Sequence, residues 1–482
     1  MEILGFSVAL LCGVLVGIGR LDVLLWVLLG VVVLGVIAWA FQVVVASPRT
    51  AGFWLFGVAV FCVTWSGVRV SGGATLSDVF LLLSTPFAIA GFLDRFTSFR
   101  LPWWLLSGAG LLALAIFIHE VLPQSEVLTP VQQAPAMFSF QDASGSSLSM
   151  GIRLLVALIG VPLVATFLVR DWGQIRVLAN LWIFGIFVSC LVAVLDFSFG
   201  TGLQVSLGSS DLSQGAFGAN NYGVSGADVR YVGLTFHPVA LSISSSMAVP
   251  LVLSRMFSLR KAALYLPVLL VILGASLLSG SRTSILLFFV TAAIFLVWKT
   301  SYAKPLVLWI GIFILVLFVL KYGGVSVVPE RFLKPGEFIA SNQARVDNFG
   351  EGMSLFLSSP VIGHGFEYAR QAHNIALQLL ASGGFAALIG YYLVTLGYLR
   401  EGIRVSQLKV RELGLDLVGV TVAFAVFLIA GVVSNTIFER YLYVPAGIIM
   451  AAAMLSREAR MKRRLSRTQN RPRNDVHLDR TD

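Results

Sequence analysis

Long apolar stretches separated by short polar turns run through most of the chain. A transmembrane helix needs about 20 apolar residues in succession, and the sequence holds about fourteen stretches of roughly that length. They lie near 1–19, 23–45, 52–68, 76–93, 101–121, 149–169, 175–199, 235–254, 262–279, 283–298, 304–322, 373–398, 415–437 and 441–456. The pattern predicts an all-α polytopic membrane protein with about 14 helices, in a range of about 12–14, whose residues 1–456 form a single transmembrane domain.

Composition agrees with this fold class. The 482 residues are 57% hydrophobic and 12% charged, whereas a soluble domain carries roughly twice that share of charge. The first stretch begins Met1-Glu2, without a basic segment, and a second stretch follows at once, so it is predicted to be retained as a helix. Cys12, Cys62 and Cys190 all fall within apolar stretches, which indicates neither a disulfide framework nor a metal site.

The net charge of +10 is concentrated in the connections between apolar stretches and in the tail 457–482. With fourteen spans and a cytoplasmic N-terminus, every basic cluster lies on the cytoplasmic side, as lysine and arginine prefer. This predicts that both termini are cytoplasmic and that the basic tail is disordered. A nucleic-acid-binding tail is the alternative, but a cytoplasmic membrane-protein tail carries such charge in any case, so we expect no nucleic-acid partner. The clusters are Arg49, Arg95/Arg100, Arg170/Arg176, Arg255/Arg260/Lys261, Lys299/Lys304, Arg400/Arg404/Lys409/Arg411 and eight residues of the tail.

The long polar segments 122–148, 200–234 and 323–372 all lie on the outer face under this topology. Apolar residues at helical spacing over Asn348–Ser358 predict a short helix on the membrane surface within the large periplasmic loop 323–372. Irregular backbone in a polytopic protein is found where it lines a cavity. The functional site is therefore predicted to open outward.

Arg282 lies in the tight outer turn between the ninth and tenth stretches, within Ser279-Gly280-Ser281-Arg282-Thr283. The first turn of a helix disfavours a cation. An arginine in an outer turn also departs from the preference of lysine and arginine for the cytoplasmic side. A bound anion would remove both penalties, because a helix N-terminus with a guanidinium group forms a phosphate site. The alternative is an arginine that reaches lipid headgroups.

Arg230 and His237 flank the outer start of the eighth stretch, where Pro238 suits the first helical turn. Two arginines, Arg230 and Arg282, could each bind a diphosphate bidentately, which lysine would not imitate. His237 could contact substrate, or it could be a packed residue that bonds a loop carbonyl, which the sequence favours.

His373 opens the twelfth stretch from outside, at the head of a membrane-length helix. The positive helix end favours the neutral imidazole, the form that a general base requires. A structural histidine at the membrane interface is the alternative. His364 fits a loop residue better than a second base. Arg345, Arg370 and Asn374, beside the candidate base or within the preceding loop, are further candidates for substrate contacts.

Several common motifs are absent from the sequence. No D-x-D or E-x-D carboxylate pair occurs, nor a Walker-type phosphate loop or G-x-S-x-G. Charged residues do not recur deep within successive apolar stretches, as a proton relay would require. The candidate site is therefore predicted to need neither a metal ion nor another cofactor.

Three blocks, in this order and spacing, resemble the O-antigen ligase and polymerase family of bacterial envelope glycosyltransferases. They are Arg230 with Gly233-x-x-x-His237-Pro238, then Ser279-Gly280-Ser281-Arg282-Thr283, then Pro360-x-x-Gly363-x-Gly365 leading to His373-Asn374. The resemblance covers roughly residues 150–440. In the family's histidine motif the last position is Gly, Thr or Tyr, whereas Ala387 stands here.

The resemblance implies a GT-C-like fold in the bacterial inner membrane and a metal-independent inverting glycosyl transfer on its periplasmic face. The donor would be a glycan on undecaprenyl diphosphate. His373 would activate the acceptor hydroxyl, while Arg230 and Arg282 would hold the diphosphate leaving group, whose developing charge guanidinium groups stabilise.

If the protein is a glycosyltransferase, two activities are possible, and they differ in the acceptor. A polymerase extends another lipid-linked repeat, which we favour on the number of spans and the length of the loop 323–372, whereas a ligase transfers to lipid A core or another acceptor. A chain-length regulator is a possible partner. Other classes are a transporter of lipid-linked oligosaccharide, although no internal repeat is visible, and a scaffold for other envelope enzymes.

Overall fold

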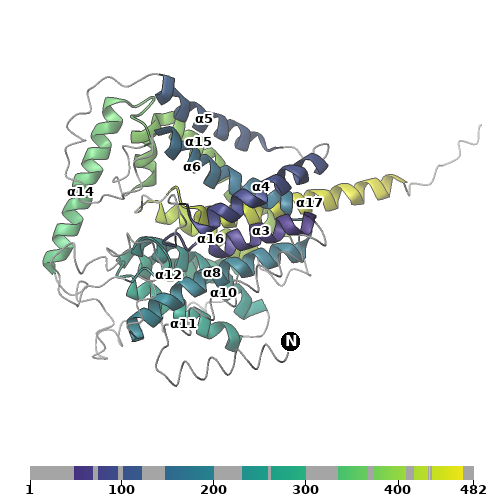
Figure 1. The fold of residues 1–482 in the computed structure, drawn as a ribbon, viewed down its shortest axis with the longest axis horizontal. Coiled ribbons are helices and arrows are strands. Elements are labelled where there is room, and N and C mark those ends of the chain that lie inside the picture. Colours follow the sequence, from purple (N-terminus) through teal and green to yellow (C-terminus); the bar gives the residue numbers. More distant parts are fainter. Residues whose placement is uncertain are drawn as a thin grey trace, which may run out of the picture.

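The computed structural model describes residues 48–68, 74–95, 101–121, 147–199, 231–258, 262–299, 335–366, 374–408, 417–432, 434 and 437–469. This part of the chain is helical and contains no β-strand (Figure 1). Five of its helices are long and apolar enough to cross a membrane: Leu76–Arg95, Ser147–Leu168, Trp172–Phe199, Pro238–Met256 and Ile375–Ser406.

The helices follow the predicted apolar stretches closely. Stretches 1–19, 23–45 and 304–322 lie outside the described residues, so the total of fourteen spans stays a prediction. The elements are α3 (Pro48–Cys62), α4 (Leu76–Arg95), α5 (Trp103–Val121), α6 (Ser147–Leu155), the π-helix η4 (Val156–Gly160), α7 (Val161–Leu168), α8 (Trp172–Phe199), α10 (Pro238–Ser258), α11 (Ala262–Leu278), α12 (Arg282–Lys299), α14 (Pro335–Ser358), α15 (Ile375–Ser406), α16 (Leu417–Ala430), the 3-10 helix η7 (Arg440–Tyr443) and α17 (Val444–Gln469).

Helix α10 forms the centre of the second half of the bundle. It packs against α8, α11, α12 and α16. Of the residues in its apolar membrane-spanning segment, 89% are buried within the protein. Small residues allow the close approach: a Cβ on Gly419 of α16 would lie 2.9 Å from the Pro250 carbonyl oxygen. Ser245 of α10 also shares a 2.7 Å hydrogen bond with Ser276 of α11, which satisfies both hydroxyl groups in the interior.

Two predictions about helix length were wrong. The segment 335–358 forms the 24-residue α14, not a short helix over 348–358, and α14 runs across one end of the bundle, crosswise to the other helices (Figure 1). Helix α17 continues to Gln469, so residues 457–469 of the tail are helical and not disordered. Both segments are polar, so no apolar stretch marks them as helices in the sequence. A polar segment can still form a helix, because its backbone hydrogen bonds are internal and its charged side chains face water.

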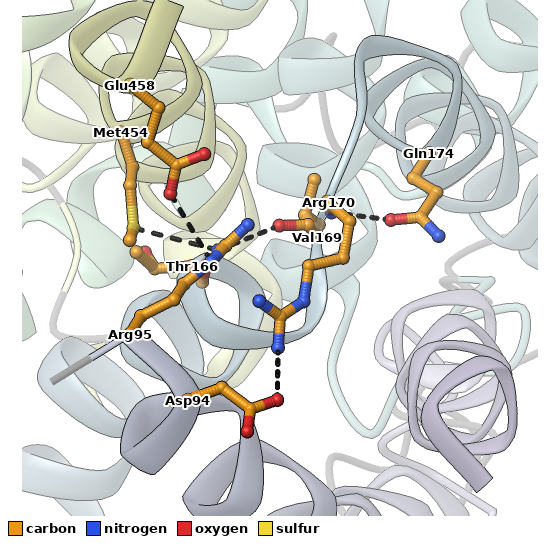
Figure 2. Close-up of polar contacts among 8 residues, drawn as sticks. All are labelled: Asp94, Arg95, Thr166, Val169, Arg170, Gln174, Met454 and Glu458. Atoms are coloured by element: carbon orange, nitrogen blue, oxygen red, sulfur yellow. Dashed lines mark hydrogen bonds and ion pairs between the residues drawn. The ribbon is translucent and has the colours of Figure 1, made fainter. Parts of the chain in front are cut away.

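The end of the bundle opposite α14 is joined by ion pairs (Figure 2). Arg95, at the end of α4, donates to the Thr166 carbonyl of α7 at 3.0 Å and pairs with Glu458 of α17 at 3.3 Å. Arg170 pairs with Asp94 at 3.6 Å. Basic residues from two separate connections and the polar part of α17 therefore meet at one end, as the predicted topology requires.

Candidate functional site

The turn between α11 and α12 places Arg282 as the first residue of a helix, as the sequence predicts. Gly280 has a φ of +61°, and its amide donates to the Leu277 carbonyl at 3.0 Å, so α11 ends in a left-handed cap that suits glycine. The Ser279 hydroxyl donates to the Ser276 carbonyl at 2.7 Å and accepts from the Ser281 amide at 3.3 Å. The serines and the glycine of this motif thus build the turn that positions Arg282.

The segment that precedes α10 is fixed beside this turn. The Tyr231 amide donates to the Leu278 carbonyl at 3.1 Å, which joins the residue after Arg230 to the last residue of α11. Arg230 itself lies outside the described residues. The backbone hydrogen bond nevertheless brings together the two chain regions from which the predicted diphosphate-binding arginines arise.

Gly233, in the first motif, packs against the backbone of α8. Its φ is +58°, and a Cβ there would lie 2.2 Å from the carbonyl oxygen of Ser189 in α8, so only glycine fits without movement. The Ser189 hydroxyl accepts from the Leu234 amide at 3.0 Å, and the Gly67 amide donates to the Leu234 carbonyl at 2.9 Å. Sequence reasoning missed Ser189 because its hydroxyl lies within an apolar stretch that gives no signal.

His237 caps α10. Its Nδ1 accepts a hydrogen bond of 3.1 Å from the Val239 amide in the first turn, a donor that has no partner within the helix. A neutral ring that accepts at Nδ1 carries its proton on Nε2. The structure thus favours the packed alternative for His237, although its partner is a backbone amide and not a carbonyl.

Asn374 fixes the start of α15. Its side-chain oxygen accepts from the Leu377 amide at 3.0 Å, an N-cap bond. Its side-chain nitrogen donates to the Val432 carbonyl at 3.1 Å, and the Ile375 amide donates to the Gly431 carbonyl at 2.8 Å. These bonds join the N-terminus of α15 to the end of α16 and give Asn374 a structural role beside its predicted substrate contact. His373, the residue before it, lies outside the described residues.

The three predicted motif regions share one end of the bundle. The contact of Gly419 with Pro250 and Ser254 puts the beginning of α16 against the second half of α10. Helix α16 therefore runs antiparallel to α10, and its end points toward the start of α10. The N-termini of α10, α12 and α15 accordingly gather with the C-terminus of α16. Helix N-termini carry partial positive charge and exposed amides, which together favour an anion.

Helix α15 is broken about two turns after its capped start, and the third motif fills the break. Gly383 and Gly384 have non-helical backbone angles, with a φ of +59° at Gly384. The carbonyls of Ala381 and Ser382 accept 2.8 Å hydrogen bonds from the amides of His364 and Gly365, and the Phe385 amide donates to the Pro360 carbonyl at 3.1 Å, all across the break. The backbone groups that the helix loses are thus satisfied by the loop.

Ala387 lies under this break and is fully buried. A Cβ on Gly383 would come within 2.6 Å of the Ala387 side chain. Ala387, where the sequence departs from the family's histidine motif, therefore packs directly against Gly383, and a side chain at Gly383 would collide with it.

A pair of histidines connects the loop to its neighbours. His119, at the end of α5, bonds the Ile362 carbonyl at 2.7 Å. His364 Nε2 lies 2.7 Å from the Ser358 hydroxyl and 3.0 Å from the Leu355 carbonyl. Partial burial lowers the pKa of His364, the bond to Leu355 raises it, and nearby His119 lowers it further. His364 thus anchors α14, in agreement with the prediction that it is a loop residue.

The remaining candidates are spread apart or lie outside the described residues. Arg345 is exposed on α14, and Arg370 belongs to the part of the loop that is not described. Within the described ranges, no three His, Cys, Asp or Glu side chains gather as metal ligands do. Cys62 and Cys190 are buried, free thiols.

The family comparison falls on this part of the molecule. No protein of curated function matches the chain. Residues 267–392, from α11 to the middle of α15, match the family model described as O-antigen ligase. The match includes the turn at Arg282, the loop on the broken helix and the start of α15, and members of this family are glycosyltransferases. The five long apolar helices indicate a membrane protein, and residues 267–392 are similar to the O-antigen ligase family.

Proposed function

We propose that the protein is a metal-independent inverting glycosyltransferase that moves a glycan from undecaprenyl diphosphate to a sugar hydroxyl on the periplasmic face of the inner membrane. The observation that carries the proposal is the gathering of three helix N-termini, each next to one of the motif regions, at one end of the bundle. That end attracts an anionic group. A lipid diphosphate at a membrane surface has the required charge.

Each predicted residue has a defined role in this reaction. His373 takes the proton of the acceptor hydroxyl, and the acceptor oxygen attacks the anomeric carbon of the donor. The bond between that carbon and the diphosphate oxygen breaks, and the electron pair leaves with the diphosphate. Arg230 and Arg282 stabilise the charge that develops on this leaving group. The attack from the face opposite the leaving group inverts the anomeric configuration.

Two features of the described residues support these assignments. The bond between the Tyr231 amide and the Leu278 carbonyl holds the region after Arg230 against the turn that begins α12 with Arg282, as a shared diphosphate requires. Asn374 caps the N-terminus of α15, and the positive end of a helix favours a neutral imidazole over a charged one, which supports the role proposed for His373. His237 and Asn374 support the site through their caps.

The identity of the acceptor distinguishes a ligase from a polymerase. The matched family model is described as O-antigen ligase, which favours transfer to lipid A core or another acceptor. The number of apolar stretches and the long outer loop favour a polymerase that extends a lipid-linked repeat. A transporter of the same lipid-linked oligosaccharide would use the same anion-binding end without breaking a glycosidic bond.

One experiment separates these functions. Purified full-length protein is incubated with undecaprenyl-diphosphate oligosaccharide, with or without lipid A core, and the products are resolved by size. Chain growth without added acceptor identifies a polymerase, and transfer that depends on lipid A core identifies a ligase. Unchanged donor in both incubations, with donor movement across proteoliposomes, would identify a transporter and contradict the proposal. Transfer abolished by EDTA would contradict metal independence.

A further inference from the structure

A cavity lies at the ion-paired end of the bundle, away from the candidate site. Its volume is about 420 Å³. It opens between the start of α5, the end of α15 and the polar part of α17. The lining residues are Pro102, Trp103, Trp104, Arg400, Glu401, Ile403, Arg404, Gln407 and Arg457.

Close packing of α5 against α15 fixes the wall of this cavity. A Cβ on Gly397 would lie 2.3 Å from the Trp104 ring, so α5 approaches α15 at a glycine. The rings of Trp104 and Tyr398 meet edge to face with centroids 5.3 Å apart. Trp104 is buried, so this wall is closely packed.

The lining has a surplus of positive charge. It holds three arginines and one carboxylate, Glu401. Glu401 is only 10% exposed and pairs with Arg457 at 2.9 Å and with Arg404 at 3.4 Å. Arg400 is exposed and has no acidic partner among the described residues. Arg404 Nε is buried and has no hydrogen-bond partner within the same residues. An anion can therefore add to this cluster without displacing a carboxylate.

Exposed apolar side chains continue from the cavity along both helices. Trp103 is 65% exposed at the start of α5, and Leu106 is 55% exposed one turn further. On α15, Ile403 and Leu396 are 39% and 53% exposed. Tryptophan prefers the boundary between hydrocarbon and headgroups. The cavity therefore combines a cationic end with apolar surfaces that lead away from it.

We propose that this cavity binds the phosphate headgroup of an anionic phospholipid of the cytoplasmic leaflet. Arg400 and Arg404 contact the phosphate, Arg457 and Glu401 hold Arg404 in place, and the acyl chains lie along Trp103 and Leu106. Basic pockets between transmembrane helices on the cytoplasmic side suit such headgroups, and the basic clusters that meet at this end predict that side. The positive start of α5 adds to the attraction.

The test uses native mass spectrometry of purified, delipidated full-length protein titrated with phosphatidylglycerol. We expect tight binding of at least one lipid, and Arg400→Gln should weaken that binding about five-fold, the effect of one basic residue near an anionic membrane surface. Trp103→Ala should weaken it as well, by removing the apolar contact. Both side chains are exposed, so neither change should disturb folding, which a thermal melt checks.

Arg460→Gln is the matched control, because it removes the same charge from an exposed position of α17 outside the cavity and should leave lipid binding unchanged. Phosphatidylcholine tests whether net negative charge is needed. Equal binding of both lipids, or equal effects of the Arg400 and Arg460 changes, would overturn the proposal. If inorganic phosphate at the same concentration displaced the lipid, the site would serve a soluble anion and the lipid assignment would be wrong.

Discussion

The two ends of the helix bundle are held together by different kinds of contact. At the ion-paired end, Arg95, Arg170 and Arg457 each pair with a carboxylate of another helix or connection. At the candidate site, the motif regions are joined by helix caps and backbone hydrogen bonds, such as those from Tyr231 and Ile375.

The difference indicates separate roles for arginine at the two ends. Paired arginines hold helices to one another and their charge is largely neutralised, whereas the motif regions of the site are fixed by backbone groups that carry no net charge. One ion pair, between Arg440 and Asp78 at 2.6 Å, joins η7 to the start of α4 at this end as well. A site built in this way can present cationic groups and helix N-termini to an anionic substrate, and the carboxylate near Tyr231, Asp196 of α8, is buried. The four predictions below test this division of roles, from the largest expected effect to the smallest.

Replacement of His373 with alanine should have the largest effect. Loss of a general base lowers turnover by about 10²–10⁴-fold, and we expect membrane insertion and thermal stability to be retained. The measurement is consumption of undecaprenyl-diphosphate oligosaccharide by purified protein. His364→Gln, a change in the anchoring loop, is the control and should retain most activity. Turnover within about three-fold of the wild type in His373→Ala would remove the base assignment.

Arg282→Lys should reduce turnover by roughly 10–100-fold, because lysine keeps the charge but loses the bidentate geometry. The matched change at the other end is Arg170→Lys, where the exposed 3.6 Å pair with Asp94 tolerates either cation. Donor consumption is measured for both variants. Equal effects of the two substitutions on donor consumption would contradict the separate roles of Arg282 in binding the substrate and of Arg170 in pairing with Asp94.

Gly384→Ala should destabilise the protein by about 1–3 kcal/mol. The added Cβ would lie 2.2 Å from the Val361 carbonyl oxygen, at a φ of +59°. Gly110 of α5 is the control, because a Cβ there meets nothing within 4 Å, and Gly110→Ala should be neutral or slightly stabilising. Thermal unfolding in detergent measures both. Equal melting temperatures for the two variants would contradict the tight contact between the loop and the broken helix.

The smallest effect concerns pH. The pKa of His364 is lowered in the folded protein, so the unfolded loop binds a proton at a higher pH than the folded loop does. The contribution of His364 is therefore complete above its ordinary pKa of 6.5 and is lost as the pH falls through and below that value. Amide exchange at Gly363–Gly365, corrected for intrinsic rates, should become faster below that pH. In His364→Gln this dependence should disappear, and its persistence would assign the effect to another group.

Local signals in the sequence predicted much of this architecture. Apolar periodicity gave the helices, and Gly280 before Arg282 gave the tight turn, because both follow from backbone geometry within a few residues. The length of α14 and the helical part of the tail were not predicted, because polar residues can occupy a helix surface without an apolar stretch. The roles of His237 and Asn374 as caps also needed the structure, since the partners of a polar side chain depend on its neighbours in space.

By itself, the sequence determined the class of protein, the positions of most helices and the residue types available for chemistry, because hydrocarbon selects apolar stretches of fixed length and turns select glycine. The predicted topology already put the starts of α10, α12 and α15 at one end, but only the tertiary structure decided that they gather with the C-terminus of α16, and that Pro360–Gly365 fills the break at Gly383–Gly384. These contacts join residues far apart in the chain. They depend on how helices pack and on which backbone groups remain to be satisfied, and no local pattern encodes either.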